Sequence, residues 1–177
     1  MVVRDKKIEL EEKDYKNKFK KLKRYLDKDY KIISKGKDEE TQVFIKAFNQ
    51  KDLRKRYEII YDYMCDYLDK NVCVVCDFKN NKCIGNRMGT SVHKENGCCY
   101  FRNEGFCKLF KNKKCTNPNI SCKLFMCPLA EKKMGFHSLP KNYFLLKYYF
   151  NFVQRDILRY SYRKPKKDCI EDLLRKK

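Results

Sequence analysis

The chain has 177 residues, of which 42% are hydrophobic, and this is enough to form one modest core. Its formal net charge of +20 attracts polyanions such as nucleic acid, although AT-rich coding also produces a lysine-rich chain without tryptophan. The first residues carry charges where a signal peptide would be apolar, and the longest apolar stretch, 143–153, contains Lys147 and is too short to cross a bilayer. We therefore expect a cytoplasmic protein with reduced cysteines and no membrane span.

Three helices are predicted in residues 1–70 from the spacing of apolar side chains. The first is basic, and its apolar stripe consists of Tyr15, Phe19, Leu22, Tyr25 and Leu26. A turn is expected at 34–38, and a second helix begins near Val43. The third helix, over 57–68, has the most regular spacing and is expected to end near Asn71.

The central part of the chain, residues 71–138, differs from the rest in composition. It contains nine of the eleven cysteines and five of the six glycines, without sustained helical spacing. A region with so little aliphatic content needs ligation to stay folded. We therefore predict a mainly α fold in a single domain, 1–177, in which helical regions 1–70 and 139–177 flank a loop-rich, cysteine metal-binding centre. No internal repeat is apparent.

Residues after Pro140 return to helical spacing. One face of the predicted helix collects Leu146, Tyr149, Phe150, Val153 and Ile157, and further rings on its other faces predict a central, buried helix. A last short helix is expected to begin at Asp168, which has the spacing of a capping box with Glu171.

Two cysteines lie outside the central region and are predicted to be core residues. Cys65 falls on the apolar stripe of the third helix, and Cys169 lies in the last helix beside Leu173 and Leu174. Small buried cysteines are common in protein cores. Both are therefore excluded from the predicted metal site.

Nine cysteines between residues 73 and 127 are the candidate metal ligands. A Cys-x2-Cys turn lets two thiolates reach one ion at tetrahedral angles, and Cys73 and Cys76 have this spacing. Reduced thiols at such a density are open to oxidation unless they bind metal, so ligation is favoured over disulfides or unligated core cysteines. The predicted ligands are Cys73, Cys76, Cys83, Cys98, Cys99, Cys107, Cys115, Cys122 and Cys127.

The number of metal centres stays open, because nine thiols exceed the four that one zinc ion or one cubane iron–sulfur cluster requires. Either two centres form or several cysteines are structural. The preferred main site consists of Cys73, Cys76, Cys98 or Cys99, and Cys122 or Cys127. His93 is a further candidate ligand, whereas His137 is expected in a turn. Zinc and iron both accept thiolates, so the identity of the metal also stays open.

The central cysteines resemble a known family. The segments that carry the resemblance are Gly97-Cys-Cys99, Cys107-Lys-Leu-Phe110, Lys114-Cys115 and Cys122-Lys-Leu-Phe-Met-Cys127. They are similar to successive motifs of the CxxCxxCC family, which is described as zinc- or iron-chelating and includes flagellin lysine N-methylases. The resemblance covers about one third of the chain.

The resemblance implies that eight cysteines bind metal: Cys73, Cys76, Cys98, Cys99, Cys107, Cys115, Cys122 and Cys127. The chain departs from the family's pattern in two places. Its opening motif is split, with 21 residues between Cys76 and Cys98, and the Arg-Pro that usually precedes the penultimate cysteine is absent. Methyltransferase activity would need a methyl-donor pocket and a place for a lysine substrate, and the sequence assigns residues to neither.

A basic segment near the C-terminus is a candidate nucleic-acid interface. Its cations would neutralise phosphates while its rings stack on unpaired bases, and an ordinary solvated surface is an equal alternative. The residues are Arg159, Tyr160, Tyr162, Arg163, Lys164, Lys166 and Lys167.

Two functions follow from these patterns. The first is a metal-binding protein with zinc or an iron–sulfur cluster, and such a centre would suit a protein-modifying enzyme. The second is a zinc-braced module that binds nucleic acid or an acidic protein through its basic surface. The spacing of a phosphate-binding loop and the Cys-x3-Cys-x2-Cys spacing of radical enzymes do not occur.

Overall fold

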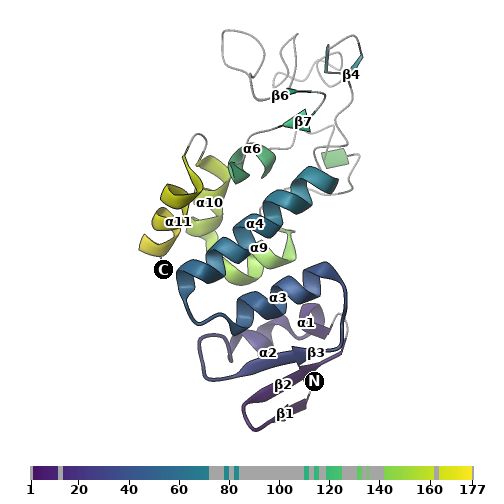
Figure 1. Cartoon of the computed structure of the whole chain (residues 1–177), viewed down its shortest axis with the longest axis vertical. Helices are drawn as coiled ribbons and strands as arrows, with labels where there is room; N and C mark the ends of the chain where they lie inside the picture. The colour runs from purple at the N-terminus through teal and green to yellow at the C-terminus, as the bar shows by residue number, and fades with distance from the viewer. Residues whose placement is uncertain are drawn as a thin grey trace.

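The computed structural model describes residues 2–11, 14–71, 78–79, 82–83, 110–111, 114–115, 119–124, 131–132, 135, 142–161 and 164–176. The described part is mostly helical, as predicted, and includes a small three-stranded sheet. Figure 1 shows this sheet at one end of the molecule, with the helices arranged above it.

The sheet is formed by β1 (Val2–Arg4), β2 (Lys7–Leu10) and β3 (Lys31–Ser34), in that order. β1 runs antiparallel to β2, and β3 runs parallel to β2. Side chains alternate between the two faces, since Ile8 and Ile32 are buried whereas their neighbours Lys7 and Lys31 are exposed. The prediction of helix throughout residues 1–70 was therefore wrong for these strands, because each of them shows the alternation over only three or four residues.

The predicted basic helix is divided into two short pieces, α1 (Asp14–Asn17) and α2 (Phe19–Lys23). Leu22 is fully buried, and Leu26 packs against the same core after the helix has ended. A left-handed backbone at Asp27, where φ is 67°, is incompatible with continued helix and turns the chain towards β3.

The next two helices, α3 (Glu39–Asn49) and α4 (Leu53–Asn71), confirm the predictions from periodicity. Asp38 caps α3, because its side chain accepts a hydrogen bond of 2.9 Å from the backbone N–H of Thr41. α3 packs on β3 on one side and on α4 on the other. It thereby connects the sheet to the rest of the helices.

A buried arginine holds the junction between these helices. Arg56 of α4 donates hydrogen bonds to the backbone oxygens of Ala47 and Gln50 at the end of α3, at 3.1 Å and 2.7 Å. Its guanidinium also forms an ion pair of 2.6 Å with Asp27. A side chain thus supplies hydrogen bonds to carbonyls at the end of a helix, where few intrahelical donors are available.

The C-terminal part contains α9 (Phe144–Tyr149), α10 (Phe152–Tyr160) and α11 (Lys166–Arg175). One continuous buried helix was predicted for the region that α9 and α10 occupy, and this prediction was wrong. The helix breaks because Asn151 caps α10 in a capping box with Gln154. Four of the six residues of α9 are buried, but Phe152 and Val153 of α10 are exposed.

The last helix also begins earlier than predicted. α11 starts at Lys166 after Pro165, so Asp168 lies within its first turn and does not cap it. A proline fixes its own φ near the helical value and suits the start of a helix, which explains the earlier boundary. Asp168 still lies where a negative charge stabilises a helix N-terminus.

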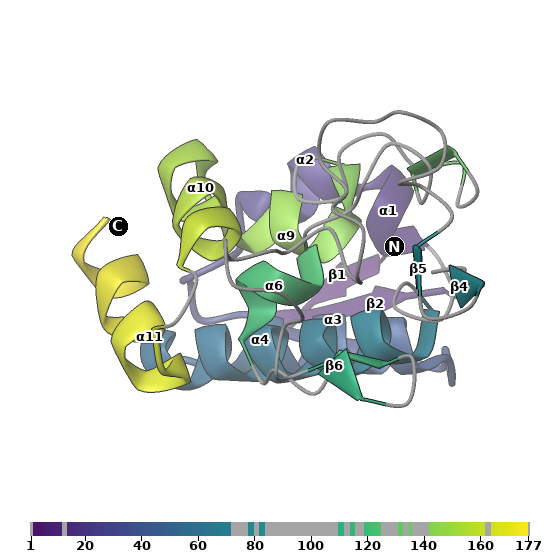
Figure 2. The same ribbon diagram turned by 90° about the horizontal axis from the view of Figure 1, so that it is seen from above.

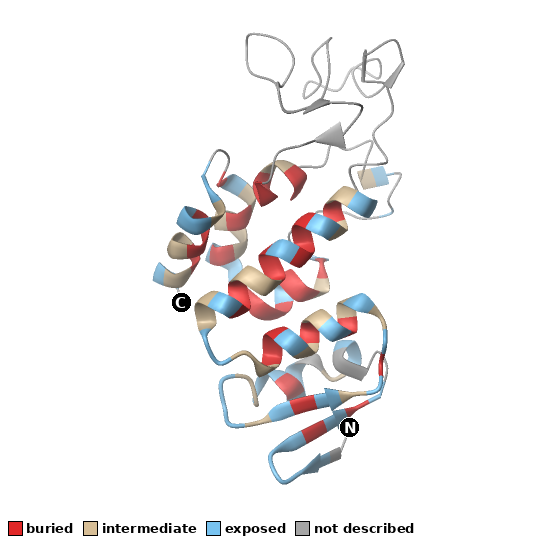
Figure 3. Ribbon diagram, viewed as in Figure 1, coloured by how far each residue is buried: buried red, intermediate tan, exposed pale blue. Residues whose placement is uncertain are grey.

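The core lies between the helices and extends to the inner face of the sheet. Figure 3 shows buried residues along α3, α4 and α9. Its centre is rich in aromatic rings: Phe44 contacts the rings of Phe48, Phe144, Tyr148 and Tyr149, with centroids 5.0 to 6.1 Å apart. None of the helices in the described ranges is both long enough and apolar enough to cross a membrane.

Candidate metal centre

The nine predicted ligands divide into those that the structure describes and those that lie outside the described residues. Cys83, Cys115 and Cys122 belong to the described part. The other six lie outside it, as do both histidines: Cys73, Cys76, Cys98, Cys99, Cys107, Cys127, His93 and His137. The proposed partition of ligands between sites therefore stays a prediction.

Cys122 lies on α6 (Ile120–Leu124), a single helical turn between α4 and α10. Figure 2 shows α6 beside α4. The Tyr61 hydroxyl of α4 accepts a hydrogen bond of 3.1 Å from the backbone N–H of Ile120. The Ser121 hydroxyl donates to the backbone oxygen of Leu158 in α10. Both neighbouring helices therefore fix the position of α6.

Two further side chains anchor the same segment. The side-chain amide of Asn119 donates to the backbone oxygens of Ser161 and Lys164, both at 2.7 Å. Lys123 is almost completely buried and pairs with Asp69 near the end of α4. A charged side chain is rarely buried unless it is paired, so this contact defines how α6 sits on α4.

Cys122 is the residue of α6 that remains half-buried, while Ile120, Ser121, Lys123 and Leu124 are buried. Its backbone is thus held by its neighbours, and the residue is only partly buried. A ligand on an anchored element loses little conformational freedom when it binds an ion. Cys65 and Cys169 are buried, whereas Cys122 combines an anchored backbone with partial exposure.

Cys83 and Cys115 occupy equivalent positions in two short hairpins. β4 (Phe78–Lys79) pairs with β5 (Lys82–Cys83), and β6 (Phe110–Lys111) pairs with β7 (Lys114–Cys115). The register is the same in both, since Phe78 lies opposite Cys83 and Phe110 lies opposite Cys115.

The two hairpins also share a sequence, Phe-Lys-Asn-Asn-Lys-Cys at 78–83 and Phe-Lys-Asn-Lys-Lys-Cys at 110–115. The interpretation that the chain contains no internal repeat was therefore wrong at this scale. The repeat was visible in the sequence, but it is six residues long and falls below the periods of 20 to 50 residues that mark repeat folds.

Cys65 and Cys169 are core residues, as predicted. Both are buried, and both belong to the apolar faces of their helices. Burial raises the pKa of Cys65 to about 12, against the opposing charge of Lys123. Burial likewise raises the pKa of Cys169, opposed by a hydrogen bond to Ser161. These thiols stay protonated at neutral pH and are poor nucleophiles and poor metal ligands.

A tyrosine cluster that the sequence analysis missed joins α3, α4 and α9. The Tyr143 hydroxyl donates a hydrogen bond of 2.9 Å to Glu40 and lies 3.4 Å from the Tyr63 hydroxyl. Glu40 also pairs with Lys16 at 2.8 Å. Burial raises the pKa of Tyr143, so its hydroxyl stays a hydrogen-bond donor. The cluster braces the end of α4 from which the cysteine-rich region continues.

The donor set suits a thiophilic metal. Cysteine thiolates bind zinc and the irons of iron–sulfur clusters and have little affinity for hard cations such as Mg²⁺ and Ca²⁺. Among the residues that the structure describes, no three or more His, Cys, Asp or Glu side chains converge on one point that could hold an ion. The metal-binding hypothesis therefore depends on the cysteine-rich region as a whole.

Several of the predicted nucleic-acid residues make contacts within the protein. Arg159 lies over the exposed ring of Tyr160, 5.1 Å from its centroid. Lys164 pairs with Asp172 of its own region, and Lys166 pairs with Asp62 of α4 at 2.7 Å. Lys167 is exposed, and Tyr162 and Arg163 lie outside the described residues. These exposed ion pairs are weak and easily screened by salt. They neither support nor exclude binding of nucleic acid, so the interface stays a prediction.

Comparison with known proteins gives no relative from which a function could be inferred. No known family model, curated protein or solved structure matches the chain.

Proposed function

We propose that this chain is a metal-binding protein whose central cysteines hold zinc or an iron–sulfur cluster. Nine cysteines within 55 residues support the proposal. The observation that carries it is the position of Cys122, half-buried on a turn that α4 and α10 hold through buried hydrogen bonds. An anchored thiol beside a cysteine-rich region is what a metal site built on a helical frame requires.

The finer function that we propose is protein modification of the CxxCxxCC type. This proposal rests on the resemblance of the motifs between Gly97 and Cys127. An iron–sulfur centre would supply redox or Lewis-acid chemistry, whereas closed zinc sites would only brace the fold. Zinc alone would favour the second candidate, a module that binds nucleic acid or an acidic protein, for which the exposed Tyr160 ring beneath Arg159 offers a stacking surface.

The direct test is elemental analysis with an ultraviolet–visible spectrum, on full-length protein purified without oxygen. Iron with acid-labile sulfide, and absorbance near 400 nm, would support a cluster, for which absorbance of this kind is typical. Zinc with a colourless spectrum would support structural sites. Protein that contains neither metal would contradict the proposal.

A matched pair of variants tests the role of Cys122. We expect Cys122→Ala to lower the metal content per chain, because an anchored ligand is lost. Cys169→Ala removes a thiol that is fully buried in the core and should leave the metal content unchanged. Equal metal content in both variants, with both folded by circular dichroism, would exclude Cys122 from the site.

Removal of the metal gives a second readout. In the native protein, iodoacetamide should label few cysteines, because metal protects the central thiols and burial protects Cys65 and Cys169. A chelator should expose the central cysteines to labelling while Cys65 and Cys169 stay protected, as peptide mass spectrometry would show. If the central cysteines react as fast before chelation as after it, they do not bind metal.

A further inference from the structure

Three cations lie side by side across the sheet. The antiparallel register of β1 and β2 places Arg4 opposite Lys7, and the parallel register of β2 and β3 places Lys7 beside Lys31. We call these three residues the cation row. Neighbouring strands lie about 4.8 Å apart, so the backbone positions of the row span about 10 Å.

The cation row lies on the solvent face of the sheet. Residues that are partners across strands point to the same face, and Arg4, Lys7 and Lys31 are all exposed. The opposite face carries Ile8 and Ile32, which are buried, and α3 packs against β3. In Figure 1 the sheet forms the lower end of the molecule, and no labelled element lies beneath it.

No carboxylate of the described residues pairs with the cation row. The nearby Asp29 forms ion pairs with Lys6 at 2.9 Å and with Lys51 at 4.0 Å, and Lys31 acts on it only through a longer-range charge interaction. Glu9 is exposed on the same face but belongs to the next row, opposite Ile33. Like charges directly opposite each other on a sheet are destabilising. Repulsion within the row therefore lowers the stability of the free protein, and a bound anion would relieve it.

We propose that this face of the sheet binds the phosphate backbone of a double-stranded nucleic acid. A duplex carries one negative charge per about 1.7 Å of its axis, so a row of about 10 Å meets several phosphates at once. Among the side chains described on this face, Ile33 is the large apolar one, at 48% exposed. One such side chain offers little to bury in a lipid surface, and the side chains described on this face include no aromatic ring on which unpaired bases would stack.

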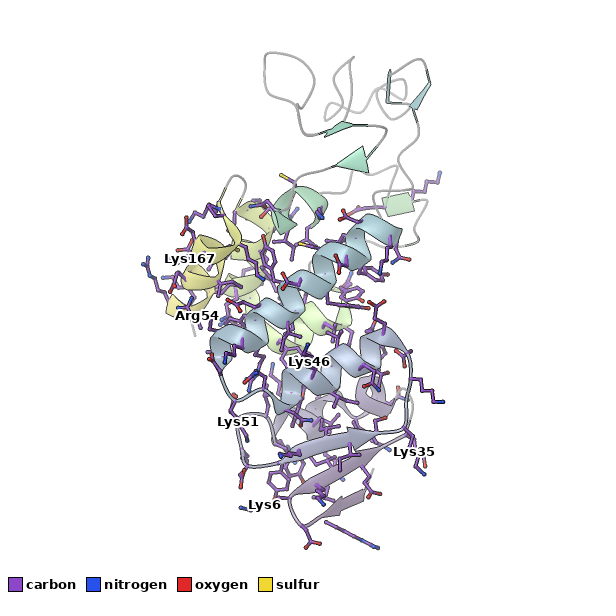
Figure 4. The ribbon with its side chains drawn as sticks, in the orientation of Figure 1. Lys6, Lys35, Lys46, Lys51, Arg54 and Lys167 are labelled. Atoms are coloured by element: carbon purple, nitrogen blue, oxygen red, sulfur yellow. The ribbon has the colours of Figure 1, made fainter. Side chains whose placement is uncertain are left out.

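Contacts of this kind position a protein on nucleic acid without reading its sequence. The surface is distinct from the C-terminal segment around Tyr160, and it does not depend on the central cysteines. Figure 4 shows Lys6 at the end of the molecule that the sheet occupies, with Lys46 on α3 and Lys167 farther away. The proposal can therefore be tested independently of metal binding.

The test is binding of a fluorescent 20-base-pair DNA duplex of mixed sequence, measured by anisotropy between about 50 and 300 mM salt. The variant replaces the cation row by Arg4→Gln, Lys7→Gln and Lys31→Gln. Each phosphate contact contributes about 0.9 to the slope of log K against log salt, so we expect the slope to fall by about 2 to 3 and the affinity to fall at least about tenfold near 100 mM.

The control removes the same charge from other elements. Lys46, Lys55 and Lys147 are exposed on α3, α4 and α9, and their triple Gln variant has the same net charge as the row variant. We expect it to change the slope by less than about 1. Equal losses in the two variants, or an unchanged slope in the row variant, would overturn the proposal.

Two further measurements complete the test. The row variant should unfold at the same temperature as the parent or higher, because a repulsion is relieved, and a lower unfolding temperature would contradict the argument from charge. Vesicles of phosphatidylcholine and phosphatidylserine in a 3:1 ratio provide the other polyanion. If the row variant loses vesicle binding but keeps duplex binding, the face is a membrane surface and the proposal is wrong.

Discussion

The helical end of the molecule and its sheet end are stabilised in different ways. Around α4, α9 and α10, large rings fill the core, and several of their hydroxyls form hydrogen bonds, as when Tyr149 donates to the backbone oxygen of Phe44 at 2.7 Å. The described side chains that the sheet buries are aliphatic, namely Ile8, Leu10 and Ile32. Arg56 joins α3 and α4 to Asp27, in the turn that leads to β3, through polar contacts. The sheet end should therefore be the first to open.

This comparison implies two levels of local stability. Regions that bury much apolar area open only with global unfolding, whereas regions held by a few polar contacts open at lower cost. Substitutions at the two ends should consequently differ in how far their effect spreads through the molecule, and not only in its size.

The largest effect is expected at Phe44. This ring is fully buried among four others, so Phe44→Ala should lower the free energy of unfolding by about 3 to 5 kcal/mol. Phe152→Ala is the matched control, because that ring is 61% exposed, and it should cost less than about 0.5 kcal/mol. Urea denaturation would measure both values, and similar losses would contradict the assignment of the aromatic core.

Arg56→Met should have the second largest effect. The substitution leaves the carbonyls of Ala47 and Gln50 without their buried donor, and we expect a loss of roughly 2 to 4 kcal/mol. Lys55→Met, at an exposed neighbouring position, is the control and should be nearly neutral.

Hydrogen exchange would show where the Arg56 variant opens. Amides of β3 and of the end of α3 should exchange faster, while those of α9 stay protected. Uniform acceleration across the molecule would mean that the two ends unfold as one unit, which would remove the distinction drawn between them.

The smallest effect is expected at Asp38, where it depends on pH. Burial acts to raise the pKa of this carboxyl, but hydrogen bonds from Thr41 outweigh it and hold the pKa below its usual value. The cap therefore stabilises the fold above the unfolded-state pKa of about 4, and the contribution is lost as the pH falls through the lower folded-state pKa.

At pH 7, Asp38→Ala should cost about 1 kcal/mol, as is typical for loss of an N-cap. The difference from the parent protein should shrink below about pH 4, and thermal unfolding at several pH values would measure it. Asp38→Asn keeps an acceptor for the Thr41 amide and should lose less at pH 7. A difference that is constant with pH would show that the carboxylate charge is not involved.

The fold could be predicted from the sequence where periodicity extends over many residues. α4 spans 19 residues, and its apolar stripe repeats often enough to identify both the helix and its buried face. The strands of the sheet are only three or four residues long, so their alternation of period two is too brief to recognise. The break before α10 was missed because apolar spacing continues through Asn151, although Asn151 and Gln154 have the capping spacing.

The candidate site was predictable in its chemistry but not in its geometry. Cysteine density identifies thiolate ligands from the sequence alone. The support of Cys122 could not be predicted from the sequence, because Tyr61 and Leu158 lie far away in the chain and contact its neighbours Ile120 and Ser121 only through tertiary packing. The cation row could not be predicted from the sequence either, because it depends on the register of three strands.

The side chain of Asn49 has a consequence for how the protein behaves at high concentration. Its amide accepts from the backbone N–H of Ile32 at 2.8 Å and donates to the backbone oxygen of the same residue at 2.9 Å. An incoming strand would form these same two hydrogen bonds at that position. Asn49 therefore saturates backbone groups through which an edge strand can pair with another molecule and aggregate. A strand of another molecule that approaches β3 finds the backbone N–H and C=O of Ile32 already hydrogen-bonded. Growth of the sheet from one molecule into the next is therefore blocked on that side.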